Sequence, residues 1–161
     1  MNIRRASLDD IAAIDHLRRK ESDAVGFIPL GCYEAEVTGQ RNGRLWIADE
    51  NEDPVGFLFA TFGRSVAHIQ QVVVREDARR AERATALVEM AEAEALRRGL
   101  LQIGCRAADD LNAVDFWRAL NFEHVGNVPG GSRRDRRISF FRKPLGIEYL
   151  PGMGRQNGAR G

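Results

Sequence analysis

Three short apolar segments, a long amphipathic segment and a further apolar segment follow one another in mid-sequence, and this order constrains the fold most. The first three, residues 44–50, 55–63 and 67–74, are separated by brief polar turns, which predicts antiparallel strands. The next segment predicts a helix, because apolar residues recur at three- and four-residue spacing before a terminal glycine: Ala84, Leu87, Val88, Ala91, Ala95, Leu96 and Gly99. Residues 100–107 follow as a strand, so the two strands joined by this crossover helix are expected to be parallel.

The remaining segments add elements on both sides of this unit. Ser7 followed by Asp10 is a capping pattern, which predicts that a helix starts after a strand at residues 1–6. The other expected elements are a short helix through Tyr33 and Val37, a helix at 111–120 and strands at 124–128 and 136–143. The predicted fold class is α/β (α+β), with a mixed, mostly antiparallel central sheet of about six to seven strands flanked by about four helices.

Composition bounds the number of domains. The chain has 161 residues, of which 43% are hydrophobic and 29% are charged, and these values are typical of one globular domain. We expect this domain to span residues 1–146. Residues 147–161 are rich in glycine and poor in apolar side chains, which predicts a mobile C-terminal tail.

Charge, cysteine content and hydropathy exclude several classes of protein. The formal net charge of +1 argues against a strongly basic nucleic-acid-binding protein. Cys32 and Cys105 lie far apart without the spacing of metal ligands, so two reduced thiols and no metal site are expected. Because no apolar run has the length of a membrane span or a secretory signal, we expect a cytoplasmic protein without membrane contact. A monomer and a homodimer are both compatible with the sequence.

An arginine-rich loop between the third strand and the long helix is the first candidate binding site. Val72, Val73 and Val74 are followed by arginines at positions 75, 79, 80 and 83. A helix N-terminus has unpaired N–H groups and a positive dipole end, which suit a phosphate or pyrophosphate. A solvated basic helix start is the alternative interpretation from charge alone.

Three motifs in this order resemble the GNAT acetyltransferases. In that family a strand leads into a Gln/Arg-x-x-Gly-x-Gly/Ala loop, and Arg79 and Ala84 match its first and last positions. The segment AVDFWRALNFE is similar to the family's Ala-x-x-hydrophobic-Tyr-x-x-x-Gly-Phe segment, and IRRASLDDIAAI is similar to its first strand and helix. The resemblance covers residues 2–143. It implies a GNAT-like acyltransferase domain that uses acetyl-CoA as cosubstrate and no metal.

The resemblance also implies which residues contact coenzyme A. They lie at the end of the strand, in the loop and at two later positions: Val72, Val73, Val74, Arg79, Arg80, Ala81, Glu82, Arg83, Ala84, Asp110 and Trp117. Three of them depart from the family pattern. Glu82 replaces the loop glycine, Asp110 replaces an asparagine, and Trp117 replaces the tyrosine that commonly protonates the departing thiolate. Because an indole N–H is not a usable acid at neutral pH, water or another side chain must supply that proton.

Glu82 has two alternative orientations. If its carboxylate faces the pyrophosphate, charge repulsion weakens coenzyme binding. If it faces solvent, which we expect, it favours the start of the helix, and its replacement by glycine costs on the order of 1 kcal/mol of stability.

For the reaction, the resemblance implies direct transfer of the acetyl group to a primary amine. The thioester would lie between the strand that ends at Val74 and the strand that starts at Leu101. A backbone N–H near Val72 or Val73 would polarise the thioester oxygen. The identity of the acceptor amine is left open.

The general base is ambiguous, because the glutamate that the family often carries on this strand is absent. His68 on the same strand has a suitable intrinsic pKa and is one candidate. Asp23 and Glu21, in the loop expected on the substrate side, are alternatives. A structural histidine and ordinary solvated carboxylates are the competing interpretations.

A second arginine cluster follows Gly130 and Gly131. It consists of Arg133, Arg134, Arg136 and Arg137, which could contact the phosphates of a nucleic acid or nucleotide acceptor. An exposed hairpin with a solvated tip is the alternative. Together with DAVGFIP and FWRALNF, this turn is also similar to GNAT-related proteins of phage origin, including the Mom type that modifies adenine in DNA. A third alternative is a protein that binds coenzyme A without catalysis.

Overall fold

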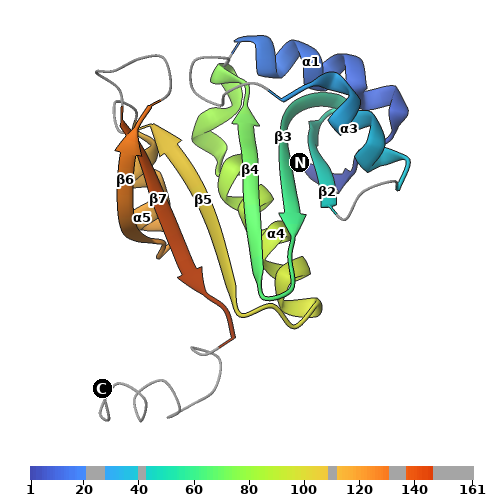
Figure 1. Cartoon of the computed structure of the whole chain (residues 1–161). Helices are drawn as coiled ribbons and strands as arrows, with labels where there is room; N and C mark the ends of the chain where they lie inside the picture. Colours follow the sequence, from blue (N-terminus) through green and yellow to red (C-terminus); the bar gives the residue numbers. More distant parts are fainter. Residues whose placement is uncertain (21–27, 40–42, 109–111, 131–136, 147–161) are drawn as a thin grey trace, which may run out of the picture.

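The computed structural model describes residues 1–20, 28–39, 43–108, 112–130 and 137–146 (Figure 1). Its strands are β1 (Asn2–Arg5), β2 (Gly43–Glu50), β3 (Asp53–Phe62), β4 (Val66–Val74), β5 (Gln102–Ala108), β6 (Glu123–Pro129) and β7 (Arg137–Pro144). Its α-helices are α1 (Ile11–Lys20), α3 (Leu30–Val37), α4 (Arg83–Arg97) and α5 (Ala113–Ala119). Two short 3₁₀ helices, η1 (Leu8–Asp10) and η2 (Glu76–Ala81), precede α1 and α4.

The strands form one seven-stranded sheet in the order β1-β2-β3-β4-β5-β7-β6. The pair β4 and β5 is parallel, and the other neighbouring pairs are antiparallel. The predicted mixed, mostly antiparallel sheet is therefore confirmed, as is the parallel pair around the crossover helix. β7 pairs with β5 and leaves β6 at the edge, so the last strand of the sequence lies inside the sheet.

Helices cover the two faces of the sheet unequally. Figure 1 shows α4 and α5 on one face and α1 and α3 on the other, where they lie over β2 to β4. Alternate strand residues supply apolar side chains to the two layers. The α4 layer includes Leu58, Ile69, Ile103, Cys105 and Phe141. The α1 and α3 layer includes Leu45, Ile47, Phe57, Phe59 and Val73.

Helix α4 packs on the sheet through one stripe of small and aliphatic side chains. Leu87, Val88, Ala91 and Ala95 are each 0% exposed. Burial of a leucine or valine side chain contributes about 1.5–3 kcal/mol, so this stripe anchors the helix. Gly99 ends the segment with a φ of 73°, a backbone conformation that glycine adopts without strain. The start of α4 is thereby held at the end of β4.

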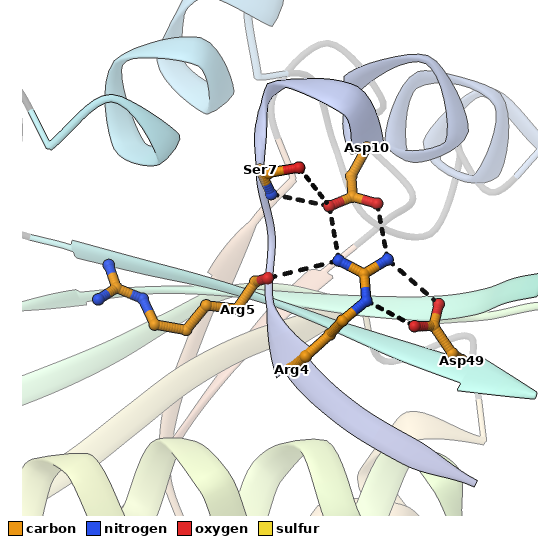
Figure 2. A network of polar contacts seen from close by, with 5 residues as sticks. All are labelled: Arg4, Arg5, Ser7, Asp10 and Asp49. Carbon is orange, nitrogen blue, oxygen red and sulfur yellow. Dashed lines mark hydrogen bonds and ion pairs between the residues drawn. The ribbon is translucent and has the colours of Figure 1, made fainter. Parts of the chain in front are cut away.

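A partly exposed arginine, Arg4, joins the N-terminal strand to the sheet and to the start of α1 (Figure 2). The Arg4 guanidinium donates to both Asp10 oxygens at 2.8 Å, and its Nε lies 2.5 Å from Asp49 Oδ2. The Ser7 N–H donates to Asp10 Oδ2 at 2.7 Å, which confirms the predicted capping pattern. The hydrogen bond from Arg4 is the main cause that lowers the pKa of Asp10. This network fixes β1 to β2 and sets the direction of α1.

Two further predictions concern cysteines and membrane contact. Cys32 and Cys105 are free thiols, and burial raises the pKa of Cys105. No helix in the ranges given above is both long and apolar enough to cross a membrane. The predicted tail, residues 147–161, lies outside the described residues.

Candidate active site

The ladder between β3 and β4 is interrupted in the middle of β4. Phe59 pairs with Gln71, but the next residue, Ala60, pairs with Ile69, so Gln70 is an extra residue in β4. A bulge of this kind leaves one residue outside the ladder and bends the strand. The bulge therefore changes the direction of β4 just before its Val72–Val74 end.

The pairing between β4 and β5 stops at the same level. It runs from Val66 and Gln102 to Ile69 and Cys105. β5 continues to Ala108 with β7 as its partner, and β4 continues to Val74 with β3 as its partner. Figure 1 shows the two strands diverging toward their carboxyl ends. The sheet thus contains a wedge-shaped gap with β4 on one side and β5 on the other, which we call the β4/β5 gap.

The register decides which backbone groups face this gap. The Arg75 N–H donates to the Val55 carbonyl at 2.7 Å, on the β3 side. Because backbone groups alternate in direction along a strand, the N–H and C=O of Val73 also point toward β3. Those of Val72 point toward β5. Of the two valines considered for the thioester oxygen, Val72 is the one whose backbone faces the gap.

A buried pair of side chains lies directly behind the bulge. The Tyr33 hydroxyl in α3 donates to Gln71 Oε1, and the two residues are 0% and 3% exposed. The Tyr33 ring makes edge contacts with Phe57 and Phe59, at centroid distances of 6.0 and 5.8 Å. Burial raises the pKa of Tyr33 to about 12, so its hydroxyl is protonated and available as a donor at neutral pH.

The loop between β4 and α4 ends in an unusual backbone conformation. η2 is followed by Glu82, which has a φ of 59° and a ψ of 20°. This left-handed conformation favours glycine and costs about 1–2 kcal/mol for other residues. The Glu82 side chain is exposed, and it caps no backbone group of α4. The loop therefore has, at Glu82, a backbone conformation that a glycine adopts more readily.

The first intrahelical hydrogen bond of α4 runs from the Ala86 N–H to the Glu82 carbonyl, at 3.0 Å. The three preceding N–H groups, those of Arg83, Ala84 and Thr85, come before any partner within the helix. They lie at the same end of β4 as the gap. An anion such as a pyrophosphate fits this arrangement of donors.

Arg83 was included among the residues expected to contact coenzyme A, but its side chain is directed into the fold. It is 7% exposed and donates from Nη1 to the Ala78 carbonyl at 2.7 Å. Its Nη2 lies 2.5 Å from Glu50 Oε2 at the end of β2. The guanidinium therefore joins η2 to β2. Of Arg83, the backbone N–H is the group that stays in a position to contact coenzyme A.

His68 lies on the α1 and α3 face of β4, two residues before the bulged Gln70. Its neighbours in the sheet are Thr61 on β3 and Gly104 on β5. Partial burial, and then the nearby guanidinium groups of Arg142 and Arg106, lower the pKa of His68 below its usual value. The imidazole is therefore neutral at pH 7 and can accept a proton.

Trp117, the residue at the position of the family's tyrosine, is a core residue. It is 3% exposed, and its ring makes edge contacts with Phe116 and Phe122 at centroid distances of 5.0 and 4.9 Å. This packing holds α5 against the sheet. The aromatic position of the motif is thus used for packing in this chain.

Several predicted site residues lie outside the described residues: Glu21, Asp23, Asp110, Arg133, Arg134 and Arg136. The side chains of Arg79, Arg80 and Ala81 are likewise not described, although their backbone belongs to η2. Arg137 is described, and its guanidinium donates to Asn127 Oδ1 across the β6–β7 hairpin. The nucleic-acid alternative therefore stays a prediction, with one of its four arginines bonded within the hairpin.

A family model decides the identity. The model described as "Acetyltransferase (GNAT) family" matches residues 11–122, which include α1, the bulged strand, α4 and α5. The chain belongs to the GNAT acetyltransferase family. The GNAT match confirms the resemblance drawn from the three motifs, and the chain is accordingly an acetyltransferase.

Solved structures with the same fold cover nearly the whole chain. A ribosomal-protein-alanine N-acetyltransferase from Brucella melitensis has a TM-score of 0.77 and 18% identity, covering 90% of this chain and 100% of that one. The ribosomal-protein-S18-alanine N-acetyltransferase from Escherichia coli has a TM-score of 0.73 and 16% identity, with coverages of 91% and 94%. An aminoglycoside 6′-N-acetyltransferase in complex with coenzyme A has a TM-score of 0.72 and 18% identity, with coverages of 89% and 97%.

A search of curated proteins returned no match. At these identities the solved structures establish the GNAT fold and leave the acceptor of this chain open. Two residues next to the gap, Tyr33 and Gln71, were missed by the sequence motifs. The signal for them was weak, because a tyrosine in a short helix and a glutamine in a strand have no fixed spacing.

Proposed function

We propose that this GNAT acetyltransferase transfers the acetyl group of acetyl-CoA directly to a primary amine. The observation that carries the proposal is the parting of β4 and β5 directly after the Gln70 bulge, at the end of the sheet where α4 begins. The backbone groups of β4 that face the β4/β5 gap, those of Val72, are therefore close to a helix N-terminus. A thioester and a pyrophosphate joined in one ligand need both features.

The residues present fit coenzyme A. The left-handed backbone at Glu82 keeps the loop in the shape that a glycine would give, and the exposed carboxylate is turned to solvent. We assign the pyrophosphate to the N–H groups of Arg83, Ala84 and Thr85. Arg79 and Arg80 are proposed to contribute charge from the preceding turn. The acetyl-CoA, when bound, supplies an activated acetyl group in a thioester.

Three groups of the chain are assigned roles in the transfer. The Val72 N–H donates to the acetyl oxygen, which gains negative charge as the amine attacks. Neutral His68 accepts the proton that the attacking ammonium must lose, through a water molecule. The nitrogen–carbon bond forms as the carbon–sulfur bond breaks. Since Trp117 is buried and not acidic, water supplies the proton that the sulfur takes up, and water receives the second proton that the nitrogen loses as the amide forms.

Thermal unfolding with acetyl-CoA tests the proposal. A ligand that binds only the folded state at a hundredfold excess over its Kd stabilises it by about 2.7 kcal/mol. We expect acetyl-CoA to raise the Tm, and ATP at the same concentration to raise it less, because ATP has phosphates but no pantetheine arm. An unchanged Tm at millimolar acetyl-CoA would overturn the assignment of the donor.

A further inference from the structure

The half of the sheet formed by β5, β7 and β6 carries α5 and part of α4 on one face, and Figure 1 shows none of the described helices on the other. Ile103, Cys105 and Phe141 point to the α4 and α5 face. Their neighbours along each strand therefore point to the open face. Across this open face, His68, Gly104 and Arg142 are direct neighbours in one row.

Gly104 leaves a hollow between the side chains of His68 and Arg142, its two neighbours in the row. A Cβ atom built on Gly104 would lie 3.2 Å from the Phe141 carbonyl oxygen, 3.6 Å from Arg142 Cγ and 3.8 Å from His68 Nδ1. The backbone of Gly104 is not left-handed, so its conformation does not demand a glycine. The close approach of the Phe141 carbonyl oxygen on β7 favours glycine at this position. Because Gly104 has no side chain, the open face is low here, with an imidazole on one side and an arginine on the other.

Within the described part of the chain, Arg142 beside this hollow differs in its bonding partner from several other arginines. Arg4, Arg75, Arg83, Arg97 and Arg98 each form a salt bridge with a carboxylate. Among the residues that the structure describes, Arg142 instead donates to the neutral Gln102 Oε1, at 3.3 Å.

Arg106 adds a second positive charge beside the hollow. It lies on β5 one position beyond Cys105 on the open face, and no acidic partner is found for it within the described ranges. Arg106 and Arg142 both lie close enough to His68 to lower its pKa. On the described strands, Glu123 is an acidic residue beside this row, because it pairs with Arg142 on the edge strand β6. The hollow is therefore a small, positively charged site with Glu123 at one side.

The hollow lies at the closed end of the β4/β5 gap. His68 and Gly104 precede Ile69 and Cys105, the last pair before the strands part. Arg106 follows that pair directly. An acceptor lying on the open face would reach the gap from the side opposite α4, and a negatively charged part of it would meet the hollow.

We propose that this hollow binds a carboxylate of the acceptor, so that the acceptor is a primary amine that also carries an acid group. The inference rests on the proposed transfer to an amine and assigns its substrate class. A carboxylate accepts a forked pair of hydrogen bonds from an arginine, and Arg142 borders the hollow. A nucleic acid would need an extended basic stripe, whereas Glu123 bounds this row and the net charge is only +1.

The site can be probed without turnover through the imidazole of His68. The chain has three histidines, so the ring signals can be assigned in proton NMR spectra with a His68→Gln variant. Sodium acetate is the probe, and sodium chloride at equal ionic strength is the control. We expect acetate to shift the His68 signal saturably and to raise its pKa, because a bound anion offsets the repulsion from Arg106 and Arg142.

Arg142→Gln should weaken acetate binding about tenfold, since it removes a charge-assisted hydrogen bond, and Arg142→Lys should restore part of the loss. Arg137→Gln is the matched control, because Arg137 lies on the same strand but points to the opposite face. It should bind acetate like the parent. Equal acetate binding by Arg142→Gln and the parent, or an equal shift with chloride, would overturn the proposal.

Two competition experiments distinguish whether the carboxylate belongs to a small amino acid or to a peptide. Free 4-aminobutyrate should displace acetate if the acceptor is a small amino acid, and an end-blocked peptide with one glutamate should displace it if the acceptor is a peptide. A duplex oligonucleotide that displaces acetate at lower concentration than both would overturn the proposal in favour of a polyanion. Calorimetry with acetyl-CoA is run in parallel, because its failure contradicts the donor assignment and leaves the anion site intact.

Discussion

The Tyr33 hydroxyl donates a hydrogen bond to Gln71 Oε1, and this bond connects helix α3 to the bulge of β4. Both residues are buried, and the tyrosine ring is held between Phe57 and Phe59. Gln71 immediately precedes Val72, the residue whose backbone faces the gap. The orientation of the proposed oxyanion donor is therefore coupled to a side chain that touches no substrate.

The first prediction concerns this positioning contact. Tyr33→Phe removes the donor and keeps the ring, so we expect the free energy of unfolding to fall by about 1–2 kcal/mol. Acetyl transfer should lose about tenfold in kcat with little change in the KM for acetyl-CoA, because the lost interaction orients a donor that acts in the transition state. Urea unfolding and steady-state kinetics measure the two effects.

A double-mutant cycle with Gln71→Met separates this coupling from general damage. If the hydrogen bond is the cause, the double variant should lose less than the sum of the two single losses in kcat. Strictly additive losses, or a rise in KM at unchanged kcat, would show that Tyr33 has a packing role only.

The second prediction concerns acid stability. Hydrogen bonds from Arg97 and Arg98 lower the pKa of Glu94 from 4.5 to about 2 in the folded chain. A carboxyl group whose pKa is depressed on folding contributes stability above its unfolded pKa and loses it as the pH falls through the folded value. The contribution should therefore disappear between about pH 4.5 and 2.

Glu94→Gln should lower the free energy of unfolding at pH 7 by roughly 1–2 kcal/mol and flatten its dependence on pH below 4.5. Glu89→Gln, at an exposed position of the same helix, is the matched control and should change stability by less than about 0.5 kcal/mol. Urea unfolding between pH 2.5 and 7 measures both variants. An acid slope of Glu94→Gln equal to that of the parent would contradict the assignment.

The regular parts of this fold could be predicted from the sequence because they follow from periodicity. The spacing of Leu87, Val88 and Ala91 predicts a helix with one buried face. The apolar segment that follows this helix directly predicts a strand parallel to the one before the helix. The bulge at Gln70 could not be predicted, since the alternation of apolar residues is weakest in the polar stretch around it. Its position depends on the pairing with β3 and on the contact with Tyr33, which are tertiary effects.

The loop shows why a motif places residues more reliably than it assigns side-chain roles. Arg83 matches the position of a residue next to the pyrophosphate, yet its guanidinium bonds to Glu50 and the Ala78 carbonyl. Local charge cannot distinguish an arginine that faces a ligand from one that crosses under the loop, because the partner Glu50 is distant in sequence. The position of α4 was predictable, whereas the direction of this side chain was not.

The third prediction compares the two arginine clusters. Arg79→Ala with Arg80→Ala should weaken acetyl-CoA binding more than Arg133→Ala with Arg134→Ala, because the first pair directly precedes the start of α4 in the sequence. Each arginine that contacts a phosphate contributes about 1–2 kcal/mol, so a loss of about tenfold or more in affinity is expected for the first pair. Calorimetric titration decides between the clusters, and equal losses would mean that the anion site lies elsewhere.

The fourth prediction concerns Glu82, for which the backbone reverses the sign expected from the sequence alone. A solvent-facing acid at a helix start is expected to stabilise, and its loss to glycine to cost about 1 kcal/mol. The φ of 59° at Glu82 changes this balance, since a residue with a Cβ is strained there and glycine is not. Because the strain of about 1–2 kcal/mol exceeds the gain from an exposed charge that caps nothing, Glu82→Gly should raise the free energy of unfolding by about 1 kcal/mol.

Asn121→Gly is the matched control for this reversal. Asn121 has a similar φ of 66°, but asparagine tolerates the left-handed conformation, so the gain there should be smaller than at Glu82. Since the Glu82 carboxylate is exposed, the Kd for acetyl-CoA should change by less than about threefold in Glu82→Gly. Thermal unfolding and calorimetric titration measure both properties. A destabilised Glu82→Gly variant would contradict the strain argument, and a tenfold gain in affinity would show that the carboxylate faces the pyrophosphate.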